Sequence, residues 1–176
     1  MDISGWNYNF EHLPYWDQRK IDPYAYDALY ENKQLDIAVL IYSICEIRMC
    51  YYVGFLAIFK NKQKPELIMN ITGWTFKDSP IVFSADGKFA FIHFDWWSDG
   101  WPILIFDFIN YTFSYFYANT EGLNFTINEL KKNEFSVVHS IVGLSETSSE
   151  VKIELEKLEW MHFRDIDSFS ANLRKR

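Results

Sequence analysis

Short runs of β-branched and aromatic residues, separated by turn residues, constrain this chain more than any other feature of its sequence. They follow one another from residue 37 to residue 117. Val, Ile, Phe and Tyr favour strands, whereas Gly, Pro, Asn and Asp between such runs favour turns. We therefore expect strands at 37–49, 51–59, 66–71, 81–83, 89–94, 103–108 and 112–117.

The connections between these runs predict tight turns. Lys60–Pro65 is a charged turn, and Ser84–Lys88 contains an Asp-Gly pair that tolerates the positive φ of a hairpin. Ile109–Tyr111 is expected to form another tight turn. The run Phe89–Phe94 is apolar on both faces, which is typical of a central or sandwiched strand.

Helical segments are expected to be short and few. Thr126–Asn133 is the best candidate, because Thr126 followed three residues later by Glu129 is the pattern of a capping box. We also expect a helical turn at Asp27–Glu31 and a short C-terminal helix through Ile166, Phe169 and Leu173.

Residues 135–144 and 151–155 are expected to form a hairpin. From residue 151 to residue 156 apolar and charged side chains alternate, which gives a strand one dry face and one wet face. A helix over the same residues is the alternative interpretation, but Ile153 lies off its apolar stripe.

A weak internal repeat relates two of the expected strands. Gly54–Lys60 and Trp101–Asp107 can be aligned at an offset of 47 residues, and a turn and another strand follow each. That period is near the roughly 40–50 residues of a propeller blade. Residues 81–117 resemble one blade of a WD-like β-propeller, in which a Ser-x-Asp-Gly-Lys turn joins the first two strands and an aspartate ends the third. Ser84–Lys88 and Asp107 match these two features.

The resemblance implies a four-stranded antiparallel meander but no particular function. A closed ring typically has four to eight blades, and four blades of 47 residues would need 188 residues, more than the 176 present. The expected fold class is therefore mainly β with minor α (α+β). Its blade-like antiparallel meanders would pack as an open sheet or a sandwich, not as a complete propeller.

Composition narrows the class of protein further. Acidic residues number 24 and basic residues 17, so the net charge is −7, which argues against binding a nucleic-acid backbone. Two cysteines are too few for a disulfide-dense scaffold, and a hydrophobic share of 49% is too high for a disordered chain. No signal peptide and no membrane-spanning stretch is recognisable, so we expect a cytoplasmic protein.

We expect one domain over residues 1–176. An aromatic arm at 1–34 would pack over a sheet, blade-like meanders would occupy 35–117, and a helix, a hairpin and a C-terminal helix would occupy 118–176. The chain is long enough to bury a core without disulfides.

Motifs of common enzyme classes are absent from the sequence, including a nucleophile elbow, a Walker loop and a dinucleotide fingerprint. The four histidines, His12, His93, His139 and His162, form no paired metal-ligand spacing. His93 and Asp95 would share one strand face, where a structural hydrogen bond is expected. We therefore expect no catalytic residue, no metal and no cofactor, although folding can bring together carboxylate pairs that a sequence does not reveal.

The segment Asp95–Trp101 is the most unusual part of the sequence, with three tryptophans and two aspartates in seven residues. Tryptophan recurs at binding hot spots, because it offers a large contact area with few rotatable bonds. Between Asp78 and Asp107 one lysine and five aspartates give a charge of −4, which would attract a basic surface. We expect a partner-binding site made of Asp95, Trp96, Trp97, Asp99 and Trp101. The alternative is that the rings close one end of the sheet and the aspartates are solvated.

A second acidic stretch runs from Glu146 to Glu159 and contains five glutamates and two lysines. Glu154 is the reserve candidate for partner binding. The alternative interpretation is a solvated strand face.

By general character the chain is similar to the immunity proteins of bacterial polymorphic or contact-dependent growth-inhibition toxin systems, which are small, acidic and without catalytic motifs. The resemblance implies a one-to-one complex that blocks the active site of a basic, nuclease-type toxin domain. Asp95 and Asp99 would meet cationic groups, and the tryptophans of the same segment would anchor the complex. The resemblance to immunity proteins implies no direct contact with nucleic acid or with a membrane.

Two other interpretations stay open. One is an enzyme with a dispersed site, which a cleft around His93 and Asp95 with a strongly shifted pKa would favour. The other is a structural module of a larger assembly that oligomerises through free sheet edges or the aromatic arm.

Overall fold

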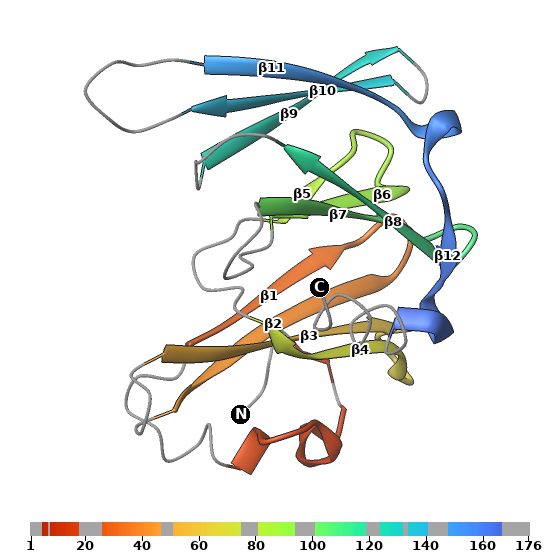
Figure 1. Cartoon of the computed structure of the whole chain (residues 1–176). Coiled ribbons are helices and arrows are strands. Elements are labelled where there is room, and N and C mark those ends of the chain that lie inside the picture. Colours follow the sequence, from red (N-terminus) through yellow and green to blue (C-terminus); the bar gives the residue numbers. More distant parts are fainter. Residues whose placement is uncertain are drawn as a thin grey trace. The chain divides into compact units, whose positions relative to one another are not determined.

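The computed structural model describes residues 5–6, 8–17, 26–46, 51–74, 81–93, 101–118, 124–131, 134–140 and 148–166. These residues form twelve strands in three antiparallel sheets, together with three 3-10 turns (Figure 1). The chain divides into two compact units, one made of Met1–Lys77 with Phe163–Arg176 and the other of Asp78–His162. The expectation of a mainly β fold with open antiparallel sheets is confirmed.

The first unit is built on a four-stranded sheet whose strands lie in sequence order: β1 (Tyr26–Asn32), β2 (Ile37–Glu46), β3 (Tyr51–Lys60) and β4 (Glu66–Trp74). Each strand is antiparallel to the next. The residues of β2 from Ile37 to Tyr42 are at most 3% exposed. Burial on both faces explains why this strand is a continuous apolar run rather than an alternating one.

The helical turn expected at Asp27–Glu31 is wrong. These residues belong to β1, which pairs with β2 from end to end. Pairing with a neighbouring strand gives the backbone N–H and C=O groups their partners in an extended conformation, so the local preference for a helical turn is overridden.

The N-terminal segment packs on one face of this sheet. Trp6, Phe10, Leu13 and Trp16 are buried in one cluster with side chains of β2 and β3. The 3-10 turn η1 (Phe10–His12) places Phe10 so that it stacks on Trp16 with 5.2 Å between the ring centroids. The Tyr42 hydroxyl donates a hydrogen bond of 2.9 Å to the backbone oxygen of Pro14. The described residues of the expected arm up to Trp16 therefore cover a sheet face, whereas residues 26–32 of that arm form β1, a strand of the same sheet.

The second unit contains a five-stranded sheet. β5 (Ile81–Phe83), β6 (Phe89–His93), β7 (Trp101–Asp107) and β8 (Thr112–Ala118) form a four-stranded antiparallel meander, and β12 (Met161–His162) pairs with β8. The meander has the topology that the blade resemblance implies. Ala90, Phe91 and Ile92 are completely buried, so β6 is a central strand, as expected from its apolar faces.

A three-stranded sheet completes this unit. It consists of β9 (Asn124–Lys131), β10 (Glu134–Ser140) and β11 (Ser148–Glu154), in the order β11-β10-β9, and β11 continues into the 3-10 turn η2 (Leu155–Lys157). Buried side chains of β10, β11 and η2 form one cluster with those of the meander: Phe135, Ile153 and Leu155 with Phe91, Ile103 and Ile105. The second unit is therefore a sandwich with an aromatic and aliphatic core.

The helix expected at Thr126–Asn133 is wrong, because residues up to Lys131 form β9. In β9, Thr126 and Ile127 lie opposite two valines of β10. β-Branched side chains on both strands favour a sheet, and this pairing outweighs the local capping pattern. Of the C-terminal helix expected through Ile166, Phe169 and Leu173, only Ile166 is described, directly after the 3-10 turn η3 (Phe163–Asp165), and the rest lies outside the described residues.

The two four-stranded meanders correspond to each other turn by turn. Lys60 and Asp107, which the 47-residue offset aligns, each end the third strand and lie opposite the first residue of the second strand. The residue after each of them donates a backbone hydrogen bond to the turn between the first two strands, from Asn61 to Asp36 and from Phe108 to Lys88. The internal repeat is thus a repeat of structure.

Over the described part of the chain, no helix is long and apolar enough to cross a membrane.

Candidate functional site

The structure describes two of the six residues expected to bind a partner. Trp101 is the first residue of β7, where it lies opposite Ala118 of β8, and Glu154 is the last residue of β11. The other four lie outside the described residues, in the connection between β6 and β7: Asp95, Trp96, Trp97 and Asp99. Both ends of that connection are described, and they show how it is anchored.

The β6–β7 connection is anchored at the end of the meander opposite to its two tight turns. It leaves β6 after His93 and enters β7 at Trp101, whereas Ser84–Lys88 and Phe108–Tyr111 join the strands at the other end. Ile92, next to its start, is completely buried. Close packing therefore fixes the end of β6 from which the connection leaves.

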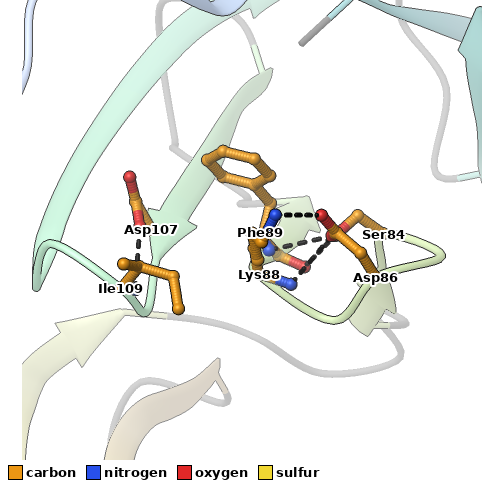
Figure 2. A network of polar contacts seen from close by, with 6 residues as sticks. All are labelled: Ser84, Asp86, Lys88, Phe89, Asp107 and Ile109. Atoms are coloured by element: carbon orange, nitrogen blue, oxygen red, sulfur yellow. Dashed lines mark hydrogen bonds and ion pairs between the residues drawn. The ribbon is translucent and has the colours of Figure 1, made fainter. Parts of the chain in front are cut away.

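The turn Ser84–Lys88 uses its aspartate internally (Figure 2). The Ser84 hydroxyl and the Lys88 backbone N–H donate to Oδ1 of Asp86 at 2.8 and 3.1 Å, and the Lys88 ammonium lies 2.9 Å from Oδ2. Burial alone would raise the pKa of Asp86, but these hydrogen bonds and the lysine charge outweigh it and hold the pKa below its ordinary value. Gly87 supplies the positive φ of the turn at 70°.

Asp107 organises the neighbouring turn in a similar way (Figure 2). Its carboxylate accepts hydrogen bonds from the backbone N–H groups of Ile109 and Asn110 at 2.8 and 3.1 Å, and from the Asn110 amide at 2.7 Å. The residue is 8% exposed. Asp107, which the blade resemblance marked as the end of the third strand, therefore closes the β7–β8 turn.

Two of the five aspartates between Asp78 and Asp107 have their hydrogen-bond partners within these two turns. These are Asp86 and Asp107, and Asp86 is paired with the single lysine of the segment. The remaining aspartates are Asp78, Asp95 and Asp99, and two of these belong to the β6–β7 connection. Two of the three aspartates outside these turns therefore lie in the connection that contains the tryptophans.

Glu154 lies on a solvated strand face. Its side chain is 49% exposed and forms an ion pair of 2.7 Å with Lys157. Along β11, Lys152 and Glu154 are exposed whereas Ile153 is buried, which is the alternation expected from the sequence. An exposed pair of this kind contributes little free energy, so Glu154 is available to a partner at small cost.

Sequence reasoning missed a polar anchor in the first unit. The Trp6 indole N–H and the Lys62 ammonium both donate to Oε1 of Glu31, at 2.6 and 2.7 Å. These hydrogen bonds outweigh burial and lower the pKa of Glu31. Trp6 lies 25 positions before Glu31 in the chain and Lys62 lies 31 positions after it, so no local sequence pattern marks the three residues.

The sequence-based prediction also did not identify the exposed apolar side chains in the turn between β7 and β8. Ile109 is 52% and Tyr111 40% exposed; with Tyr15, they are the large hydrophobic residues found exposed in the described part of the chain. The sequence does carry a signal for this surface, because Ile and Tyr stand in a tight turn where Gly, Asn or Asp is usual.

The described residues contain no group of three or more His, Cys, Asp or Glu side chains that could hold a metal ion. His93 ends β6, and its expected partner Asp95 lies outside the residues that the structure describes. Comparison with protein-family models, with curated proteins and with solved structures finds no match to this chain. The functional conclusion therefore depends on the chain's own residues.

Proposed function

We propose that this chain is a non-catalytic, acidic binding protein, and specifically an immunity protein that neutralises a cognate basic toxin domain of the nuclease type. In this proposal it covers the active site of the toxin in a one-to-one complex. The acidic residues stand in for the phosphates of the nucleic-acid substrate, and the tryptophans supply the apolar contact area.

The observation that carries the proposal is that two aspartates of the meander are bound within its tight turns. Asp86 and Asp107 hold the two tight turns in place through hydrogen bonds within those turns. Asp95 and Asp99 belong by sequence to the β6–β7 connection, which contains three of the chain's seven tryptophans when Trp101 is included. Acids next to tryptophans match the chemistry of a partner with a basic, partly apolar cleft.

The anchoring of this connection supports the same proposal. Affinity is lost when a binding segment has to become ordered in the complex, so a segment fixed at its ends by a packed sheet binds at lower entropic cost. Ile92 and Ile103, the buried residues of β6 and β7 close to the connection, are both 0% exposed. We therefore assign the main contact to Asp95, Trp96, Trp97, Asp99 and Trp101, with Glu154 as a secondary contact.

A capture experiment tests the proposal. The full chain carrying an affinity tag is expressed in the cells that produce it, and the proteins retained at low ionic strength are identified by mass spectrometry. We expect one basic domain in a one-to-one complex whose nuclease activity is inhibited, and whose association slows as salt is raised.

Two outcomes would contradict the proposal. A captured domain that keeps full nuclease activity in the complex would exclude inhibition by active-site occlusion. A chain that binds no basic protein, and whose molecular mass instead rises with its own concentration, would indicate an oligomerising structural module. Analytical ultracentrifugation of the purified chain over a hundredfold range of concentration distinguishes that case.

A further inference from the structure

The ladders between the second and third strands of the two meanders end at different points. In the first meander β2 and β3 form ten residue pairs, the last of them between Glu46 and Tyr51. In the second meander β6 and β7 form five, the last of them between His93 and Ile103. β7 itself pairs with β8 for two residues more, as far as Trp101. The pairing of β7 therefore stops on its β6 side alone.

Pro102 stands where the next pair of β6 and β7 would form. The 47-residue offset of the internal repeat aligns it with Phe55 of β3. Phe55 pairs with Tyr42 of β2, and four further pairs follow it in that ladder. In the register of the described strands β6 and β7, no pair includes Pro102. Proline has no backbone N–H, so the second meander lacks a donor at the position where the first one has it.

The pairing of β7 with β8 shows the direction in which the backbone nitrogen of Pro102 points. In an antiparallel ladder hydrogen-bonded pairs alternate with non-hydrogen-bonded pairs, and successive residues direct their N–H and C=O groups to opposite sides of the strand. Pro102 pairs with Tyr117 of β8, and the ladder continues without a register shift to Trp101. A residue without an N–H fits this ladder only at a non-hydrogen-bonded pair. Its nitrogen is therefore directed away from β8 and toward β6.

The missing N–H explains why the β6–β7 ladder ends where it does. The pair after His93 and Ile103 would be a hydrogen-bonded one, and it would require an N–H from residue 102. β7 is an interior strand of its sheet, a place from which proline is normally excluded, but at residue 102 its β6 side is no longer paired. Seven residues, 94–100, then connect β6 to β7, whereas four residues, 47–50, connect β2 to β3.

We propose that Pro102 is a positioning residue of the partner-binding connection. By ending the β6–β7 ladder, it prevents Asp95 from becoming the cross-strand partner of Trp101 and leaves the connection at its full length for the basic partner. Backbone groups that a ladder has already paired are not available to a partner, and pairing also fixes the face of the sheet to which each side chain points. This inference rests on the proposed immunity function and adds to it a residue outside the acidic and aromatic set.

Hydrogen exchange of the free full-length chain, followed by NMR, tests the structural part of the proposal. Pro102→Val restores the N–H on a β-branched residue that suits a strand. We expect the new amide to exchange at least about a hundredfold more slowly than an unstructured one, with no fall in melting temperature. The matched control is Pro65→Val in the β3–β4 turn, whose new amide should exchange within about tenfold of the unstructured rate. An unprotected amide at residue 102 would show that the missing donor does not end the ladder.

Affinity for the captured basic domain, measured by calorimetry, tests the positioning role. Pro102→Val is expected to bind at least about tenfold more weakly than wild type, and Pro65→Val within about threefold of it. A third protein carries the α-hydroxy analogue of valine at residue 102, so that an ester replaces the amide. It keeps the valine side chain but lacks the N–H, and we expect it to bind within about threefold of wild type. Equally weak binding by the valine and ester proteins would overturn the proposal, because the side chain and not the donor would then be responsible.

Failure of this proposal and failure of the immunity proposal give different results. Equal binding by wild type and Pro102→Val would overturn the role of Pro102 alone and would leave inhibition of the toxin domain intact. Capture of no basic domain would overturn the immunity proposal and, with it, the binding role of Pro102. The exchange measurement on the free chain would still decide whether the missing N–H ends the ladder.

Discussion

Truncation of Phe135 to alanine tests how the second unit is held together. Phe135 of β10 is 1% exposed, and its ring lies against two rings of β6, with centroid distances of 4.9 Å to Phe91 and 5.9 Å to Phe89. Replacing a fully buried phenylalanine by alanine costs about 3–5 kcal/mol, because both the transfer free energy and the contacts around the resulting cavity are lost. We expect the upper half of that range, since the two aromatic pairs each add about 0.5–1.5 kcal/mol.

Urea unfolding of the full chain measures this loss, and hydrogen exchange followed by mass spectrometry locates it. A loss of about 4 kcal/mol is a large share of the stability of a typical domain, so protection should fall in β6, β10 and β11 together. The strands of the first unit should keep theirs. Lys152→Ala, on the exposed face of β11, is the matched control and should change stability by less than about 0.5 kcal/mol.

A Phe135→Ala variant that loses less than about 1 kcal/mol would refute the reasoning, because a fully buried ring cannot be removed from a packed core at that cost. Loss of protection confined to β10 would also refute it. That result would mean that the three-stranded sheet does not share a core with the meander.

Two further predictions concern the first unit. Glu31→Gln should lower the free energy of unfolding at pH 7 by about 1 kcal/mol, a modest value because Lys62 is 40% exposed and its charge is screened. The folded-state pKa of Glu31 is lowered, so its contribution is present above the ordinary value of 4.5 and is lost as the pH falls through the folded pKa. Thermal unfolding followed by tryptophan fluorescence should therefore show a gap between wild type and Glu31→Gln at pH 7 that closes toward pH 3, and a gap that widens in acid would contradict this. Ser43 of β2 is 1% exposed, and its hydroxyl has no hydrogen-bond partner among the described residues. Ser43→Ala should consequently stabilise the chain by about 1 kcal/mol in urea unfolding, and a loss of stability would show that the hydroxyl is satisfied.

Local sequence pattern was sufficient for seven of the eight strands of the two meanders, the exception being β1, for which it favoured a helical turn. Each of these seven strands is a short run of β-branched and aromatic residues, and the described turns between them are short. The Asp-Gly pair of Ser84–Lys88 and the aspartate at residue 107 both mark backbone geometry that depends on neighbours in the chain. These elements were therefore predicted to within a few residues.

Local pattern failed where distant residues decide the conformation. Thr126 and Glu129 form a good capping pattern, but the valines of β10 opposite β9 determine the outcome. The packing of Phe135 on β6 could not be predicted from local pattern either, because the forty residues 94–133 separate the two strands. A single sequence does not state which strands share a core.

The candidate site was predictable in composition and not in geometry. The clustering of tryptophans and aspartates at residues 95–101 can be counted from the sequence. The hydrogen bonds that bind Asp86 and Asp107 within their turns could not be predicted in this way, because they depend on side-chain geometry. The turn at Ile109–Tyr111 was predicted from the sequence, whereas the exposure of its two apolar side chains was not.

The affinity of the Trp97→Ala/Asp99→Ala variant for the captured basic domain tests the central claim most directly. Isothermal titration calorimetry of the full chain compares it with wild type and with the control Glu156→Ala/Glu159→Ala, which removes two exposed acids elsewhere in the same unit. We expect the first variant to bind at least about a hundredfold more weakly, as for the loss of a hot-spot pair, and the control to bind within about threefold of wild type. Equal, tight binding by all three proteins would contradict the assignment of the β6–β7 connection as the inhibitory site.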